Sequence, residues 1–344
     1  MTDTAREALT DTPLLTVDNL TVDYLGGRRP ARACNEISFT LNRGEILGVA
    51  GESASGKTTL LTAIMRLQRP PAVIADGTVL YHRADGTTID LASAPESKIR
   101  PLRWVDLSIV MQSAMAALNP VTRLGKQFYD VLRMHYPEMS VKAQEQRAGD
   151  LLEMVGISRD VLRKFPHEMS GGMRQRSLIA LAMACDPELI VMDEPTTAVD
   201  VVMQREILEQ ILELQADHGF AIIFVTHDLS LLLEMADRIA IMYAGRIVEI
   251  ADGEDIADAP RHPYTEGLRN AFPSLTEPLR ELHGIPGSPP NLLDLPSGCS
   301  FHPRCPLKID RCETDRPGLD PDTPGRRVAC HVRVGSDVAR RITR

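Results

Sequence analysis

Residues 51–58 read Gly-Glu-Ser-Ala-Ser-Gly-Lys-Thr and match the phosphate-binding pattern G-x-x-x-x-G-K-[ST]. In such a loop successive backbone N–H groups converge on one concavity, and the following helix adds the partial positive charge of its N-terminus. Lys57 is then expected to reach the β and γ phosphates of a nucleoside triphosphate, and the Thr58 hydroxyl to ligate Mg²⁺. A Gly-Ser loop that only turns the chain is disfavoured, because a predicted strand precedes the motif and a predicted helix follows it.

A second candidate for phosphate chemistry is the apolar run at 188–194, Glu-Leu-Ile-Val-Met-Asp-Glu, which ends in two carboxylates. This is the form of a Walker B strand. Asp193 is expected to hold Mg²⁺, and Glu194 to polarise the water that attacks the terminal phosphate. Taken alone, the two carboxylates could instead be an acidic N-cap for the next helix. The P-loop upstream favours the catalytic interpretation.

The elements that must position these residues can be read from the apolar patterning. Residues 45–50 form a short apolar run that enters the P-loop, and residues 58–66 are typical of a helix. Further strands are predicted at 14–25, 35–41, on both sides of Asp85-Gly86 within 76–91, and at 188–193, 220–226, 238–243 and 246–250. Helices are predicted within 123–165 and at 200–217 and 228–236. The later alternation of strands and helices predicts an α/β protein with a parallel sheet covered by helices.

Length, composition and charge narrow the class of protein. The 344 residues suit two domains or one large one, and 43% of them are hydrophobic, which is enough to build a core. The formal net charge of -9 argues against a surface built to bind nucleic acid. No run of about 18 apolar residues occurs, and residues 1–12 lack the apolar segment of a secretory signal peptide. The chain is therefore expected to act in the cytosol.

Residues 169–176, Met-Ser-Gly-Gly-Met-Arg-Gln-Arg, resemble the signature motif Leu-Ser-Gly-Gly-Gln of the ATP-binding cassette (ABC) family. They lie before the Walker B strand, where that family places the motif. Met173 replaces the signature glutamine, and Ser113-Ala114 replaces the acidic-proline pair that often follows the glutamine of the Q-loop. The residues that bind phosphate are retained, so an active site is expected.

Other positions resemble the family in the same order along roughly residues 14 to 250. Tyr24 matches the aromatic that stacks on adenine, Gln112 the Q-loop glutamine, Asp200 the D-loop aspartate and His227 the switch histidine. The resemblance implies catalytic roles for Glu194, His227 and Gln112, and Mg²⁺ ligation by Thr58, Gln112 and Asp193. The ATP contacts that it implies are Tyr24, Gly51, Ser53, Ser55, Gly56, Lys57, Thr58, Thr59, Ser170, Gly171, Gly172 and Asp200.

The same resemblance implies the architecture. A P-loop (RecA-like) core with an antiparallel β subdomain and a helical signature subdomain, at about 115–185, is expected to occupy residues 14–255. A C-terminal extension is expected over 256–344, with its boundary near 255–285, where the sequence becomes rich in Pro and Gly. Two such cassettes would clamp ATP between them, each P-loop facing the partner's counterpart of Ser170.

A finer resemblance is to the ATPases of oligopeptide and dipeptide importers. It rests on Ser-Gly-Gly-Met-Arg-Gln-Arg in the signature, on Asn119-Pro120, and on two tail segments, His-Pro-Tyr-Thr at 262–265 and Gly-Cys-Ser-Phe-His-Pro-Arg-Cys-Pro at 298–306. It implies a peripheral subunit on the cytoplasmic face of the membrane. Its implied partners are a second ATPase, usually a paralogue, two permeases and an extracytoplasmic solute-binding protein, with no nucleic acid.

The sequence alone leaves open alternatives to a peptide importer. Relatives carry nickel or oligosaccharides, and the transported solute cannot be read from the cassette. An exporter ATPase is disfavoured by the tail at 252–344. A soluble ABC ATPase acting on nucleic acid is disfavoured by the negative charge and by the 113 positions from Lys57 to Ser170, too few for a long coiled-coil arm.

The tail also carries four of the six cysteines, at positions 299, 305, 312 and 330. Cytosolic thiols stay reduced, so disulfides are disfavoured, and the spacing C-x5-C-x6-C-x17-C lacks the C-x2-C pairs of zinc ribbons. Some members of the importer branch hold a [4Fe-4S] cluster here. The resemblance therefore favours ligation of a cluster by Cys299, Cys305, Cys312 and Cys330, with zinc or free thiols as alternatives and His302 and His331 as substitute ligands. A tail with so little apolar periodicity is expected to need a metal centre for its order, whereas Cys34 and Cys185 are expected in the core.

Overall fold

The computed structural model describes residues 13–27, 29–112, 117–196, 200–271 and 284–336. The chain forms two compact units. One contains Met1–Leu14, Leu41–Glu45 and Ser93–Ile223, and is called here the helical unit. The other contains Leu15–Thr40, Ile46–Ala92 and Phe224–Arg344, and is called the P-loop unit.

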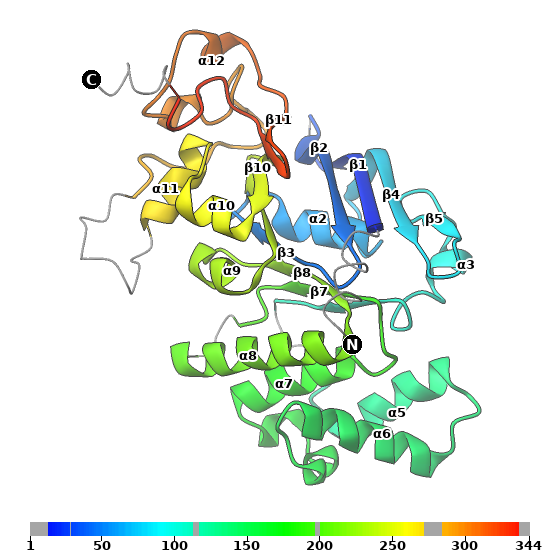
Figure 1. The fold of residues 1–344 in the computed structure, drawn as a ribbon. Coiled ribbons are helices and arrows are strands. Elements are labelled where there is room, and N and C mark those ends of the chain that lie inside the picture. The colour runs from blue at the N-terminus through cyan, green and yellow to red at the C-terminus, as the bar shows by residue number, and fades with distance from the viewer. Residues whose placement is uncertain (1–12, 28, 113–116, 197–199, 272–283, 337–344) are drawn as a thin grey trace. The chain divides into compact units, whose positions relative to one another are not determined.

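The P-loop unit is built on a sheet whose strands follow the order β11-β12-β10-β9-β3. Its strands are β3 (Ile46–Ala50), β9 (Arg238–Tyr243), β10 (Arg246–Asp252), β11 (Asp320–Thr323) and β12 (Arg326–Val328). All five residues of β3 are buried, and the chain runs from β3 through the P-loop into α2 (Lys57–Ile64) (Figure 1). The predicted strand and helix on either side of the phosphate motif are thus confirmed.

The sheet is mixed, whereas the alternation of strands and helices predicts a parallel one. β3 and β9 run parallel, but β10 runs antiparallel to β9. The two residues between β9 and β10, Ala244 and Gly245, have φ angles of 50° and 80°. A two-residue turn with positive φ at both positions forms a tight hairpin, so the strand after β9 must return beside it.

A second sheet of the P-loop unit has four strands in the order β2-β1-β4-β5. Its strands are β1 (Pro13–Tyr24), β2 (Ala31–Asn42), β4 (Ala72–His82) and β5 (Thr88–Asp90). β4 is antiparallel to both β1 and β5, and the hairpin turns at Gly86, whose φ is 82°. These pairings confirm the expected antiparallel β subdomain.

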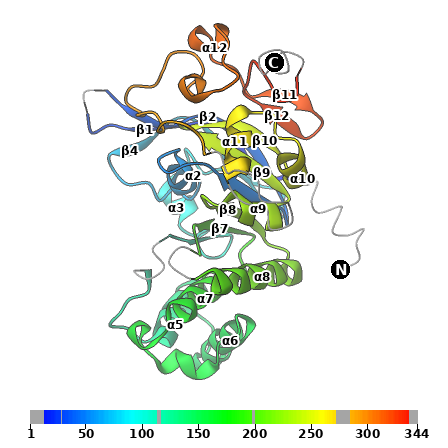
Figure 2. The same cartoon turned by 90° about the vertical axis from the view of Figure 1, so that its left-hand side faces the viewer.

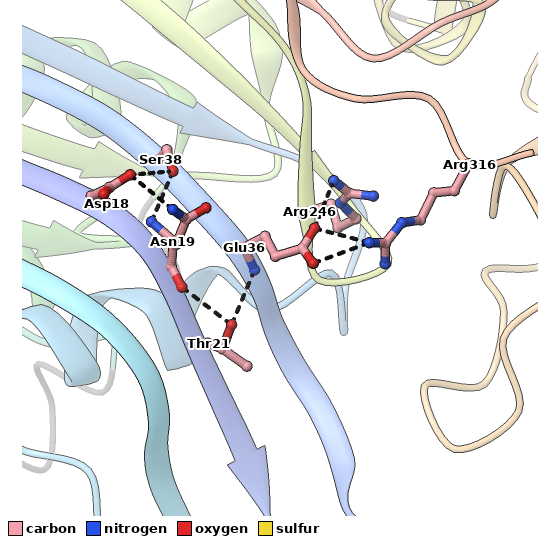
Figure 3. A network of polar contacts seen from close by, with 7 residues as sticks. All are labelled: Asp18, Asn19, Thr21, Glu36, Ser38, Arg246 and Arg316. Carbon is pink, nitrogen blue, oxygen red and sulfur yellow. Dashed lines mark hydrogen bonds and ion pairs between the residues drawn. The ribbon is translucent and has the colours of Figure 1, made fainter.

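Glu36 on β2 joins this second sheet to the C-terminal part of the unit (Figure 3). Its carboxylate accepts hydrogen bonds from Arg246 Nη2 at 3.3 Å and from Arg316 Nη2 at 2.9 Å. Its own N–H donates to Thr21 Oγ1 at 3.2 Å. Because the Glu36 and Arg316 side chains are 45% and 46% exposed, solvent screening limits what this ion pair adds to stability.

The helical unit confirms the predicted helices within 123–165 and beyond. Its α-helices are α3 (Glu96–Ile99), α5 (Leu124–His135), α6 (Val141–Met154), α7 (Gly171–Ala182) and α8 (Val201–His218). Two short 3₁₀ segments, Arg159–Arg163 and Pro166–Glu168, connect α6 to α7. The strands β6 (Leu107–Val110) and β7 (Leu189–Asp193) pair in parallel, and α5 and α6 pack on one another (Figure 1). Cys185 is 2% exposed, and burial raises the pKa of its thiol to about 11, as expected for a core residue.

The chain leaves the helical unit along β8 (Ala221–Val225) and continues through α9 (Leu229–Met235) into the C-terminal part. That part contains α10 (Gly253–Asp258), α11 (Pro263–Ala271), a 3₁₀ turn at His302–Arg304 and α12 (Arg311–Thr314). β12 pairs with β10, so the tail continues the sheet of the P-loop unit (Figure 2). The described helices include none with the length and apolar character needed to cross a membrane.

The tail has an apolar core of its own, contrary to the expectation that a metal centre must supply its order. Phe301, Leu307, Val328 and Val332 are each at most 5% exposed. Leu307 and Val332 form a small cluster against which Cys305, Ile309 and Val334 pack. These buried residues could not be predicted from apolar periodicity, because they lie on turns and short strands and not on one periodic face.

Candidate nucleotide-binding site

The P-loop needs its two glycines for steric reasons. Gly51 and Gly56 have φ angles of 154° and 103°. A Cβ at Gly51 would lie 2.2 Å from the carbonyl oxygen of Met242, and one at Gly56 would lie 2.2 Å from that of Ala33. The loop also accepts a hydrogen bond at the Ser55 carbonyl from the N–H of Gly245, at 3.0 Å. The β9–β10 hairpin therefore fixes the conformation of the loop.

Lys57 places the positive charge within this loop. Its Nζ donates to the carbonyl oxygens of Gly51 at 2.7 Å and Glu52 at 3.0 Å, and to Ser55 Oγ at 3.5 Å. Lys57 and Ser55 are buried, whereas Ser53 and Thr58 are exposed. The ammonium and the N-terminus of α2 thus lie together at one concave turn of the chain, which is the electrostatic requirement for a phosphate site.

Tyr24 lies beside the same helix. It ends β1, its side chain is partly exposed at 37%, and its hydroxyl is 3.2 Å from Thr59 Oγ1 in the first turn of α2. The structure therefore brings two of the predicted nucleotide contacts together with the P-loop. An exposed aromatic ring at this place has the chemistry of a stacking surface for a base.

His227 follows β8 and is exposed. The turn that carries it is fixed by two hydrogen bonds, from Asp228 N to Thr226 Oγ1 at 3.1 Å and from Ser230 N to Asp228 Oδ1 at 2.9 Å. Asp228 caps α9 in this way. The histidine is thus held on a rigid turn rather than inside the core.

In the helical unit, Asp193 and Glu194 have different surroundings. Asp193 ends β7 and is 1% exposed. Glu194 has a φ of 46°, an uncommon conformation that costs about 1–3 kcal/mol and is enriched at functional sites. Its Oε2 accepts a hydrogen bond from Gln112 Nε2 at 2.8 Å. The structure therefore brings together two of the three predicted catalytic side chains.

The signature segment begins α7. Ser170 is the N-cap, and its Oγ accepts a hydrogen bond from the N–H of Met173 at 3.2 Å. A Cβ at Gly171 would meet no described part of the chain within 4 Å, whereas one at Gly172 would lie 2.7 Å from Met203 Sδ. Close packing against Met203 explains why residue 172 is a glycine, but it gives no reason for a glycine at residue 171. Met173 contributes its backbone, so its replacement of the signature glutamine leaves the cap intact.

Asp200 has a structural role in this chain. It is exposed, and its side chain caps α8 by accepting from the N–H of Met203 at 3.0 Å. The neighbouring D-loop residues 197–199, and Ser113-Ala114 after the Q-loop, lie outside the described residues. A nucleotide contact by Asp200 stays a prediction.

A cavity of about 420 Å³ lies in the helical unit beside the strand that leads to Gln112. It is lined mainly by apolar side chains, among them Ile109, Val110, Met111, Leu178 and Leu181, together with Asn119 of the Asn-Pro pair. An apolar hollow of this size is typical of a binding site for another molecule.

The four tail cysteines are neighbours, but they are not arranged as a ligand set. Burial raises the pKa of the Cys305 and Cys330 thiols to about 11 and about 12. The nearby sulfur atoms of Cys299, Cys305 and Cys312 also raise the pKa of Cys330, by electrostatic repulsion. Cys330 Sγ donates to the Val332 carbonyl at 3.0 Å, and Cys305 packs against the Leu307–Val332 cluster. Within the described parts of the chain, no three His, Cys, Asp or Glu side chains are placed to hold a metal ion. Local hydrogen bonds and apolar packing orient the thiols in this structure, and ligation of a cluster by the four cysteines stays a prediction.

Two residues of the C-terminal part that no sequence motif singles out contact the P-loop. Arg304 forms an ion pair with Glu52, and the Tyr264 hydroxyl accepts a hydrogen bond from the N–H of Glu52. Both residues lie inside the two tail segments that resemble the importer ATPases, and that was the available signal. Their proximity to residue 52 is a long-range contact that no local pattern encodes.

Comparison with known proteins identifies the family. The family model described as "ABC transporter" matches residues 34–197, and that described as "Oligopeptide/dipeptide transporter, C-terminal region" matches residues 248–312. The chain is 40% identical over 320 residues to the dipeptide transport ATP-binding protein DppD of Escherichia coli, covering 92% of this chain and 96% of that protein. The chain belongs to the ATP-binding cassette family of ABC transporters.

Two further relatives agree with this assignment. The oligopeptide transport ATP-binding protein AppD of Bacillus subtilis is 39% identical over 322 residues, which covers 93% of this chain and 96% of that protein. A dimeric structure of the ATP-binding cassette MJ0796, bound to ADP and phosphate, superposes with a TM-score of 0.61 at 25% identity. The match covers 69% of this ABC chain and 98% of that one. The expected ABC cassette fold, ATP as ligand and ATPase class are confirmed.

Proposed function

We propose that this ABC ATPase is the ATP-hydrolysing subunit of a binding-protein-dependent importer of di- or oligopeptides. The observation that carries the proposal is a match along most of the chain. The relatives named for dipeptide and oligopeptide transport align with about nine-tenths of this chain, and a C-terminal region particular to that class matches residues 248–312. A cassette attached to some other transporter would share the P-loop core without needing this tail.

The nucleotide roles proposed here are those that the family resemblance implies, and the contacts within each unit support some of them. The P-loop amides and Lys57 bind the phosphates. Thr58, Asp193 and Gln112 would hold Mg²⁺, which would supply positive charge to neutralise the phosphates. Glu194 orients the attacking water, and its hydrogen bond from Gln112 supports that role because it fixes the carboxylate. His227 stabilises charge at the terminal phosphate. Gly51, Ser53, Ser55, Gly56 and Thr59 contact the phosphates, and Tyr24 stacks on the adenine.

The assembly that fits this role contains a second ATPase. Ser170, Gly171 and Gly172 present backbone N–H groups at the start of α7, and these bind the nucleotide held by the partner's P-loop. Asp200 acts at the same interface. Two permeases and an extracytoplasmic solute-binding protein complete the importer, and the chain lies peripherally on the cytoplasmic face of the membrane. The apolar cavity beside Gln112 supplies a surface for a permease. We divide the chain into a cassette at 14–255 and an importer-type extension at 256–344.

Reconstitution tests the proposed function. The chain, the second ATPase and the two permeases are placed in liposomes, and ATP hydrolysis is measured with the binding protein loaded with peptide, with nickel or with an oligosaccharide. Peptide should raise the rate by roughly 10-fold or more, a normal size for coupling between two sites, and Lys57→Ala should abolish the response. Stimulation by nickel alone, or by the oligosaccharide alone, would show that this solute and not peptide is the substrate. Full activity of the isolated monomer, independent of its concentration, would contradict the paired ATPase.

A [4Fe-4S] cluster on Cys299, Cys305, Cys312 and Cys330 is the finer part of the proposal. It is supported by four soft sulfur donors that lie near one another in the C-terminal region. Ligation would require the thiols to turn from their present hydrogen bonds, so binding must reorganise this part of the tail. Protein purified under strict anaerobiosis should contain about four irons and four sulfides per chain. One zinc without iron would make the site a zinc site, and protein without either metal would show free thiols.

A further inference from the structure

The C-terminal region contacts the phosphate-binding loop through an arginine. Arg304 donates from Nη1 to Glu52 Oε2 at 2.6 Å and from Nη2 to Glu52 Oε1 at 2.9 Å. The two partners lie 252 positions apart in the chain. The Arg304 side chain is 6% exposed and that of Glu52 is 26% exposed. A paired contact of this kind fixes both position and orientation, and its partner is the second residue of the P-loop motif.

The guanidinium of Arg304 is held rigidly from its other sides. Its Nε donates to the Pro286 carbonyl at 2.7 Å, and its Cζ lies 5.8 Å and 5.9 Å from the ring centres of Tyr243 and Phe301. The hydrogen bonds to Glu52 raise the pKa of Arg304 further above its usual range, so it stays charged. Arg304 is therefore already in position before any ligand arrives.

A second contact holds the main chain of the same loop residue. The Tyr264 hydroxyl accepts from the N–H of Glu52 at 2.9 Å, and the Tyr264 ring lies 4.6 Å from that of Tyr243 and 5.4 Å from that of Phe301. Tyr264 is fixed in turn by His262, whose Nδ1 accepts from the Tyr264 N–H at 3.0 Å. Complete burial lowers the pKa of His262 to about 3, which keeps the ring neutral and able to accept. Both tail segments thus converge on Glu52.

The charge of Glu52 explains why such a contact matters. Its carbonyl oxygen already accepts from Lys57 Nζ, so the residue belongs to the cradle that receives the phosphates. An unneutralised carboxylate on this loop would repel a triphosphate, since two like charges at short range interact strongly in a partly buried site. Pairing with Arg304 removes that repulsion and holds the side chain toward the C-terminal region.

We propose that Arg304 is a positioning residue for the P-loop, so that the C-terminal region is part of the nucleotide site and sets its affinity for ATP. Arg304 acts through Glu52, whose carboxylate it neutralises. The inference rests on the proposed function only in that the P-loop binds ATP. It assigns to the tail a role in nucleotide binding besides any role in metal binding or assembly.

A double-mutant cycle tests this inference. The affinity of the full-length chain for ATP is measured by competition with a fluorescent ATP analogue, for wild type, Arg304→Met, Glu52→Gln and the double variant. Arg304→Met should weaken ATP binding by roughly 10-fold or more, within the usual range of coupling between sites. In the Glu52→Gln background the same change should matter less than two-fold, because no carboxylate remains to be neutralised. An equal loss in both backgrounds, or no loss in either, overturns the inference.

Controls separate the inference from folding and from the proposed function. Arg316→Met removes a different ion pair of the tail, the one with Glu36 on the second sheet (Figure 3), and should leave ATP affinity within two-fold. Failure of wild type to bind ATP, with Lys57→Ala no weaker, would contradict the proposed function itself. If Arg304→Met does not fold, the cycle is run with Arg304→Gln, which removes the charge but keeps a hydrogen-bond donor at the end of the side chain. A coupling to Glu52 below two-fold there overturns the inference.

Discussion

Replacing Glu194 by Gln is expected to lower the ATP turnover of the assembled transporter by roughly 100-fold or more, while ATP still binds. The change keeps the size of the side chain and removes the charge that orients the attacking water, and one such catalytic group contributes about 10²–10⁴-fold. The hydrogen bond from Gln112 at 2.8 Å is compatible with either side chain, so the loop geometry should persist. Steady-state hydrolysis and equilibrium binding of ATP are measured on the same preparation.

Glu188→Gln is a matched control for this prediction. Glu188 lies just before the same strand, and its carboxylate forms an ion pair with Arg43 at 3.0 Å in the helical unit. The Arg43 and Glu188 side chains are partly exposed, at 17% and 31%, so solvent screening limits what the pair adds to stability. Turnover should therefore change less than two-fold. Hydrolysis that survives Glu194→Gln would remove Glu194 from the mechanism. Loss of ATP binding together with hydrolysis would show that the residue is structural.

Local stereochemistry explains why the P-loop could be predicted from the sequence. Gly51 and Gly56 adopt backbone angles and close contacts that only glycine tolerates, so their spacing encodes the shape of the loop directly. Ser170 at the start of α7 is predictable for the same reason, since a serine before a helix caps its first turn. Each of these signals involves residues a few positions apart.

Contacts between distant parts of the chain could not be predicted in this way. The Gln112–Glu194 hydrogen bond joins residues 82 positions apart. It depends on the positive φ of Glu194, a backbone conformation that the residue type does not predict. The Arg304–Glu52 pair is more distant still. In both cases the local sequence permits many partners, and only the packing of the whole unit selects one.

Long-range contacts also change the expected effect of replacing the tail cysteines. Its composition predicts a segment held by metal and separable from the nucleotide site, so that changes to its cysteines would leave ATP binding nearly intact. Instead, the Phe301 and Tyr264 rings pack together, and the Tyr264 hydroxyl contacts the P-loop at Glu52. In the sequence, Arg304 lies between Cys299 and Cys305. Any change at those thiols that moves this turn should therefore alter ATP affinity as well as tail order. Composition alone therefore predicts that ATP binding is independent of these cysteines, whereas the contacts of Tyr264 and Arg304 with Glu52 predict that it depends on them.

Gly171→Asp is expected to leave folding intact or improve it, and yet to lower ATP hydrolysis by the assembled transporter by roughly 100-fold or more. Among the residues that the structure describes, none lies within 4 Å of the added Cβ, and the first turn of α7 carries no acidic residue. A carboxylate there interacts favourably with the helix dipole, by about 0.3–1 kcal/mol, so the melting temperature should not fall. If α7 faces the partner's nucleotide, the same carboxylate opposes its phosphates, and like charges brought together at an interface cost several kcal/mol.

Gly171→Asn, which has the same size without the charge, should retain much more activity than Gly171→Asp, because it adds no repulsion. The position of the damage is read by trapping a photoreactive ATP analogue in the transporter and asking which ATPase subunit it labels. Labelling should disappear from the second ATPase and persist on this chain, since its own Lys57 and P-loop are unchanged. Loss of labelling on this chain instead would place its signature residues at its own nucleotide and contradict the paired arrangement. A lower melting temperature for Gly171→Asp would show that the glycine serves the fold, because the dipole argument predicts the opposite sign.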